Sequence, residues 1–182
     1  MLRRRQRSED PLAGVDPGAV APRFAGAVAD ALATRRRYAA LVAGMPDGPA
    51  RDALAALAPR VDRGVLAVWE TARRATEVER TVAALDPDRV TAEYKQARRS
   101  GADPTLVEAL ARRFESVHRL LNGLEDTAAQ LQVLDARLSA VIAGAAEVAL
   151  GATGGGADRL GAELDGVAAQ LHALRGALDE LG

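Results

Sequence analysis

The residues best suited to chemistry in this chain are Glu115 and His118, which lie three positions apart. In di-iron carboxylate bundles, two helices each contribute a Glu-x-x-His pair of this spacing to the metal site. A second pair is missing here, because the only other histidine, His172, has Ala169 three residues before it. The sequence therefore offers one isolated pair of metal ligands rather than a di-iron set.

Two aspartates could complete a smaller metal site. If the helices on either side of residues 101–103 form an antiparallel hairpin, His118 lies opposite residue 87. The possible metal ligands around this position are Asp86, Asp88, Glu115 and His118. The interpretation that we favour is structural: these carboxylates cap helices and pair with neighbouring arginines. We therefore expect no metal and no other cofactor.

The segment that starts at His118 also resembles the helical segment around the phosphoacceptor of histidine phosphotransfer domains. His118 and Leu120 match that pattern, whereas its usual lysine is Leu121 here and its glycine is displaced to Gly123. The resemblance implies a histidine that is phosphorylated on the surface of a helical bundle. The simpler interpretation is a histidine that flanks an apolar stripe containing Val117 and Leu121.

Short clusters of cations offer a different kind of site. A basic N-terminus attracts anionic lipid by about 1 kcal/mol per arginine near the surface, but no apolar segment adjoins it here. We expect both clusters to be solvated. The alternative for the N-terminal cluster is contact with a membrane surface, and the alternative for the cluster near the predicted hairpin tip is docking of an acidic partner. The two clusters are Arg3, Arg4, Arg5 and Arg7, and then Lys95, Arg98 and Arg99.

Helices must position all of these residues. The eight prolines all lie at or before Pro104, and the chain has a single isoleucine, which argues against a sheet. Apolar residues near the C-terminus alternate at spacings of four and three, which is typical of a helical stripe buried against another helix. These residues are Leu160, Leu164, Val167, Leu171, Leu174, Leu178 and Leu181.

Prolines, glycines and caps divide the chain into five predicted helices. Pro59 should kink or split the second of them. Asp86-Pro87 and Asp103-Pro104 each read as an N-cap followed by proline at the first helical position. The helices span about 22–43, 49–85, 87–100, 104–150 and 157–181.

The lengths of these helices predict an all-α fold built on a long antiparallel hairpin. The second and third helices together match the fourth in length, and the first and fifth fold back at the same end. We therefore predict a four-helix bundle at one end and a coiled-coil-like stalk of about 73–125. Residues 1–18 are predicted to be a disordered arm, and 19–182 a single domain.

Composition narrows the function classes. The chain has no cysteine, so disulfides, thiolate metal sites and cysteine nucleophiles are excluded. No apolar segment follows the basic N-terminus, so we expect no signal peptide. Residues 120–182 carry three cations and nine anions, and the rest of the chain lacks a concentrated basic face, which argues against nucleic-acid binding. The difference in charge between the acidic C-terminal third and the more basic remainder favours intramolecular packing or charge-complementary self-association.

The sequence is most consistent with a non-enzymatic coiled-coil interaction or scaffold protein. The high content of alanine and arginine is typical of GC-rich bacterial genomes, and we expect a cytoplasmic location with peripheral contact to the inner membrane as an option. The alternative is a metal-binding or phosphotransfer protein that uses His118. The predicted interface residues are Trp69, Val82, Lys95, Arg98, Arg99, Leu110 and Phe114.

A stalk of only two helices cannot bury all of its apolar residues, so we expect a partner for it. Pairing two stalks antiparallel about a two-fold axis would cover both sides of each. We therefore predict a homodimer through residues 73–125.

Overall fold

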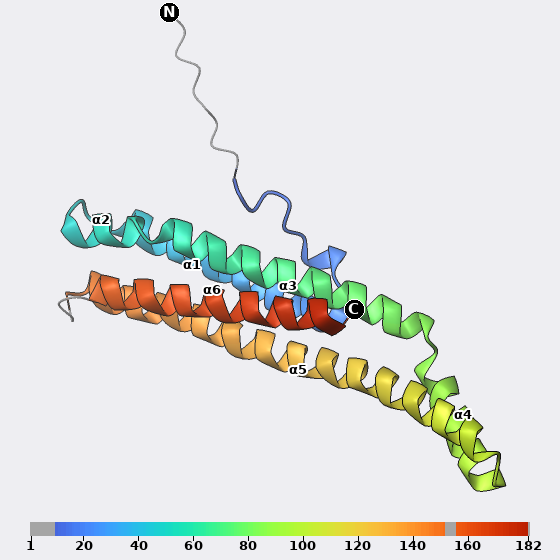
Figure 1. The fold of residues 1–182 in the computed structure, drawn as a ribbon. Coiled ribbons are helices and arrows are strands. Elements are labelled where there is room, and N and C mark those ends of the chain that lie inside the picture. Colours follow the sequence, from blue (N-terminus) through green and yellow to red (C-terminus); the bar gives the residue numbers. More distant parts are fainter. Residues whose placement is uncertain (1–9, 152–155, 182) are drawn as a thin grey trace, which may run out of the picture.

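The computed structural model describes residues 10–151 and 156–181. Within these ranges the chain forms helices and no strand, which confirms the all-α class (Figure 1). The elements in order are η1 Pro17–Ala19, α1 Pro22–Gly44, α2 Pro49–Ala55, α3 Ala58–Ala84, α4 Pro87–Ser100, α5 Pro104–Ala149 and α6 Gly156–Leu181.

Proline and aspartate set the helix boundaries, as predicted. Pro59 splits the second predicted helix: α2 ends at Ala55, the residue whose carbonyl the ring of Pro59 would meet in a continuous helix. Asp103 caps α5 by accepting hydrogen bonds from the amides of Thr105, at 2.8 Å, and Leu106, at 3.4 Å. These amides lower the pKa of the Asp103 carboxyl group, because they favour its charged form.

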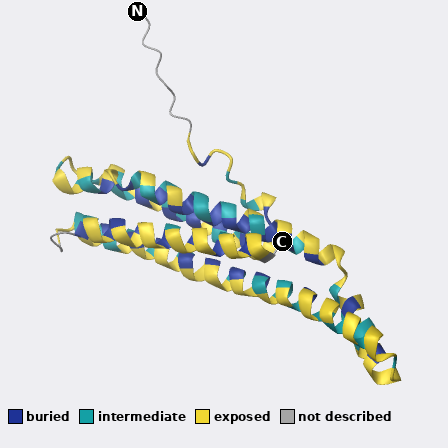
Figure 2. Ribbon diagram, in the orientation of Figure 1, coloured by how far each residue is buried: buried dark blue, intermediate teal, exposed yellow. Residues whose placement is uncertain are grey.

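Four helices, α1, α3, α5 and α6, pack lengthwise into a bundle. Both α3 and α5 contact α1 and also α6, and they contact each other across the bundle. Figure 2 shows that the buried residues follow the inner sides of these helices. The predicted stripe of α6 is buried, and the side chain of its last member, Leu181, lies outside the described residues.

The acidic last helix pairs with arginines of α3. Asp165 lies 3.4 Å from Arg60, and Asp179 lies 2.6 Å from Arg74. Glu70 of α3 in turn pairs with Arg175 of α6. The expected intramolecular packing of the acidic C-terminal third against a more basic segment is therefore observed between α3 and α6.

The helix α4 and the first half of α5 form a hairpin, and this hairpin extends beyond the bundle (Figure 1). Asp86 marks its junction with α3, at a left-handed φ of 52°. Its carboxylate accepts a hydrogen bond from the amide of Arg89 at 3.2 Å, so this residue caps α4 while the chain changes direction.

The protruding hairpin is shorter than the predicted stalk of 73–125. Val78 and Val82 were expected on the stalk, but both belong to the bundle core, and Val82 is only 2% exposed. The start of α1 covers this part of α3, where the amide of Ala21 donates to the Thr76 hydroxyl at 2.9 Å. The two-helix region therefore comprises about residues 87–120.

The segment 10–18 differs from the predicted disordered arm. Leu12 is buried in the bundle core, and Asp10 forms an ion pair with Arg35 at 3.0 Å. One apolar anchor and one ion pair hold this short segment against the bundle, although its composition is that of a loop. Residues 1–9, including Arg3, Arg4, Arg5 and Arg7, lie outside the described residues.

Two exposed glycines should respond in opposite ways to alanine. Gly101 ends α4 at a left-handed φ of 64°, so we expect Gly101→Ala to destabilise the hairpin by about 1 kcal/mol. Gly26 lies inside α1 with open space around its Cα, so Gly26→Ala should stabilise α1 by about 0.5–1 kcal/mol. Hydrogen exchange of the α4 and α1 amides measures both effects, and equal signs would contradict this assignment of the hairpin turn.

Candidate functional site

An aromatic stack joins the two helices of the hairpin. Tyr94 of α4 stacks on Phe114 of α5 with ring centroids 4.9 Å apart, and Phe114 contacts the ring of His118 at 4.1 Å. All three side chains are half-buried. The stack therefore presents part of its aromatic surface to solvent along one side of the hairpin.

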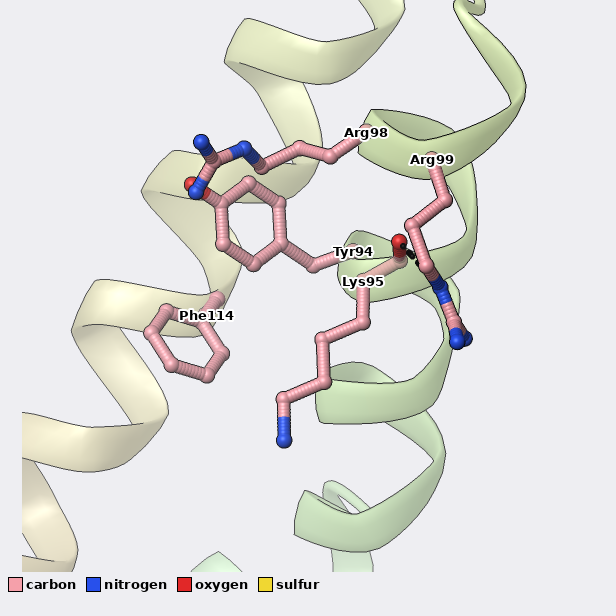
Figure 3. A pocket seen from close by; sticks show the side chains of 5 residues that line it. All are labelled: Tyr94, Lys95, Arg98, Arg99 and Phe114. Atoms are coloured by element: carbon pink, nitrogen blue, oxygen red, sulfur yellow. Dashed lines mark hydrogen bonds between the residues drawn. The ribbon is translucent and has the colours of Figure 1, made fainter.

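Three cations line a groove together with these rings. Figure 3 shows Arg98 over the Tyr94 ring, whereas the guanidinium of Arg99 points away from both rings. The guanidinium carbon of Arg98 lies 5.8 Å from the centre of the Tyr94 ring, within the range of a cation–π contact. Arg99 donates from Nε to the carbonyl of Lys95 at 3.3 Å. We call the open groove of about 610 Å³ lined by Tyr94, Lys95, Arg98, Arg99 and Phe114 the tip groove.

The cations of the tip groove have no acidic partner among the described residues. Three of the other four hairpin cations do: Glu93 pairs with both Arg89, at 2.7 Å, and Arg113, at 3.3 Å, and Glu108 pairs with Arg112 at 3.3 Å. The fourth, Arg119, has no acidic partner in the described residues. Glu93 also raises the pKa of the Arg89 guanidinium through their hydrogen bond. No acidic side chain in the described part of the chain therefore compensates the positive charge of the tip groove.

This arrangement suits the binding of an anion that also carries apolar surface. Arginine and lysine donate charge-assisted hydrogen bonds to carboxylates or phosphates, and the rings of Tyr94 and Phe114 supply an apolar floor. Each cation is exposed and keeps its water when free. Affinity would therefore come from several contacts made together rather than from one buried ion pair.

The four candidate metal ligands are not brought together. The Nε2 atom of His118 lies 3.2 Å from the hydroxyl of Thr91, so His118 faces residue 91 rather than the expected residue 87. Asp86, Asp88 and Glu115 are exposed. Within residues 10–151 and 156–181, no group of three or more histidines and carboxylates could hold a metal ion.

The shape of the hairpin tip explains this difference in register. Gly101 turns the chain back, so that the amide of Ala102 bonds to the carbonyl of Ala97 at 3.1 Å, whereas α5 begins only at Pro104. The first turn of α5 therefore extends past the end of α4. This overhang leaves Leu106 51% exposed at the tip.

The predicted interface residues divide into two groups. Trp69 and Val82 are buried in the bundle core, where Trp69 lies beneath the guanidinium of Arg73 at 5.9 Å. The others lie on the hairpin, where Leu110 is half-buried and the rest line the tip groove. These remaining residues are Lys95, Arg98, Arg99, Leu110 and Phe114.

Tyr94 is a site residue that the sequence reasoning missed. A usable signal was present, because Tyr94 and Arg98 have the i, i+4 spacing that brings side chains together on one face of a helix. Tyr94 is also one of very few aromatic residues in a chain with only 3% aromatics.

No protein-family model, curated protein or solved structure matches this chain. Among the described residues, no helix has the length and apolar character needed to cross a membrane.

Proposed function

We propose that this chain is a non-enzymatic interaction or scaffold protein that binds its partner through the α4/α5 hairpin. The observation that carries this proposal is the tip groove, where three cations without an acidic partner in the described residues lie beside the half-buried rings of Tyr94 and Phe114. Aromatic residues and arginine are enriched at protein–protein interfaces, and tyrosine and arginine are frequent among the residues that contribute most to binding.

The shape of the molecule supports a scaffold role. The helix α5 has 46 residues and is therefore about 70 Å long. It runs through both the bundle and the hairpin, so one continuous helix holds the tip groove at a distance from the bundle (Figure 1). A partner bound at the tip would be held away from the opposite end of the rod.

The proposed setting is a bacterial cytoplasm, with peripheral membrane contact as the alternative for the basic N-terminus. Metal or phosphotransfer chemistry at His118 gains no support from its surroundings. The ring of His118 lies against Phe114, and its Nε2 atom contacts the Thr91 hydroxyl. These contacts explain the histidine as part of the hairpin packing.

Site-specific photo-cross-linking in cells of the native host tests the proposal. A photoreactive residue in place of Arg98 should yield discrete cross-linked protein products. The matched control is Arg36, an exposed arginine on α1 that forms no ion pair in the described structure. Identical products from both positions, or none from position 98, would contradict a binding role for the hairpin.

A further inference from the structure

The side of α5 that borders the tip groove continues as one stripe toward the bundle. The residues of this stripe are spaced four or three apart, so they share one face of the helix. Near the tip they are half-buried beside α4, and nearer the bundle they are exposed. The stripe consists of Val107, Ala111, Phe114, His118, Asn122, Glu125 and Ala129.

An acidic patch lies at the bundle end of this stripe. Glu125 and its neighbour Asp126 are exposed and form no ion pair within the described residues. We call Glu125 and Asp126 the base patch.

The contacts across the hairpin give the distance between the two charged regions. Tyr94 faces Phe114 and Thr91 faces His118, so the cations at 95–99 are level with residue 111 of α5. Residue 125 lies 14 positions further along the same helix, which corresponds to about 21 Å. A cationic region and an acidic region therefore lie about 21 Å apart along the molecule.

We infer that a second copy of this chain occupies this surface, with two hairpins packed antiparallel about a two-fold axis level with His118. This geometry places residue 111 of each copy opposite residue 125 of the other. The tip groove of each copy then meets the base patch of the other, so two identical clusters of opposite charges form per dimer. The inference rests on the proposed function and names the partner of the hairpin.

The dimensions of such an interface are sufficient for a dimer. Two-fold pairing at this level overlaps residues 104–132 of both α5 helices, a length of about 40 Å. The face is two helices, or about 20 Å, wide along the 14 residues of α4, and α5 alone continues it. This gives about 600 Å² per copy, near the lower end of the range for stable interfaces. The exposed part of the aromatic stack lies near the middle of this area.

Reversing the charges of the two surfaces tests the inference on the full chain. The tip-reversed variant carries Lys95→Glu, Arg98→Glu and Arg99→Glu, and the base-reversed variant carries Glu125→Arg and Asp126→Arg. We expect wild type to be a dimer by light scattering and sedimentation. Each variant alone should dimerise about 100-fold more weakly or worse, because like charges then face each other.

Mixing the two variants makes the test specific. In a mixed dimer both clusters again pair opposite charges, so an equimolar mixture should recover dimerisation to near the wild-type level. Recovery would also show that both variants are folded. The control variant carries Arg36→Glu and Glu163→Arg, two exposed bundle positions, and should dimerise like wild type.

Three results would overturn the inference: a monomeric wild type, a dimer unchanged in both reversed variants, or variants that fail to recover when mixed. Photo-cross-linking at position 98 then shows whether only the dimer or also the proposed function has failed. If position 98 cross-links to another acidic protein, that protein is the partner instead of a second copy. If the chain binds anionic vesicles and the tip-reversed variant does not, the partner is a membrane surface. Loss of all cross-links at position 98 would remove the proposed function as well.

Discussion

Replacing Leu138 with alanine should lower the free energy of unfolding by about 2–5 kcal/mol, the range for deleting a fully buried leucine side chain. Leu138 is 0% exposed at the centre of the bundle. It packs so closely on α3 that a Cβ added at Gly64 would lie 3.3 Å from its Cδ1 atom. Tight packing on several sides prevents the neighbours from collapsing into the cavity.

Val133 of the same helix provides the matched control. It is 56% exposed, and five helical positions separate the two residues, which places them on different faces of α5. Val133→Ala should therefore change the free energy of unfolding by no more than about 0.5 kcal/mol. Urea unfolding of both variants, followed by circular dichroism at one protein concentration, measures the difference. Similar losses in the two variants would show that α5 has a different orientation in the bundle.

The second large effect is a loss of stability at alkaline pH that depends on Tyr38. Its ring is buried, and its hydroxyl donates to the carbonyl of Leu54 at 2.7 Å. Burial raises the pKa of the Tyr38 phenol to about 12, because the phenolate would lose its hydration. The folded state thus prefers the neutral phenol. The stabilisation that comes from this preference is complete below pH ~10 and disappears as the pH rises to about 12. The free energy of unfolding then falls by up to about 2.7 kcal/mol.

Tyr38→Phe separates the pH effect from the hydrogen bond. At pH 7 this variant should be less stable than wild type by about 1–2 kcal/mol, because the Leu54 carbonyl loses a buried donor. Between pH 10 and 12 its free energy of unfolding should fall less than that of wild type. Urea titrations at pH 7, 10 and 11.5 test this, and parallel losses in the two proteins would contradict a raised pKa at Tyr38.

Local features predicted most of the helices correctly. Pro22, Pro87 and Pro104 occupy the first turns of α1, α4 and α5, and the break between α2 and α3 falls where Pro59 requires it. These features act over a few residues, through the missing amide and fixed φ of proline and through aspartate caps. For this reason they can be recognised without knowledge of the rest of the fold.

The candidate site was only partly predictable. Lys95, Arg98 and Arg99 were recognised as a cluster because they are close in sequence. Their association with Phe114 depends on the register of the two hairpin helices. The assumption of a symmetric turn gave a register that differs from the observed one by about one helical turn. The turn residues determine this offset, because α4 ends at Ser100 and α5 starts only at Pro104, after the three residues 101–103.

The amino-acid sequence by itself determined the all-α class, the helix boundaries and the buried stripe of α6, because helical periodicity and capping are properties of neighbouring residues. Only the tertiary structure decided that Val82 is buried, that Leu12 is ordered and that Tyr94 completes the tip groove. Each of these outcomes depends on contacts between segments far apart in the chain, such as the bond between Ala21 and Thr76. The apolar pattern of one helix shows that it must be covered, and the packing of the whole chain decides which segment covers it.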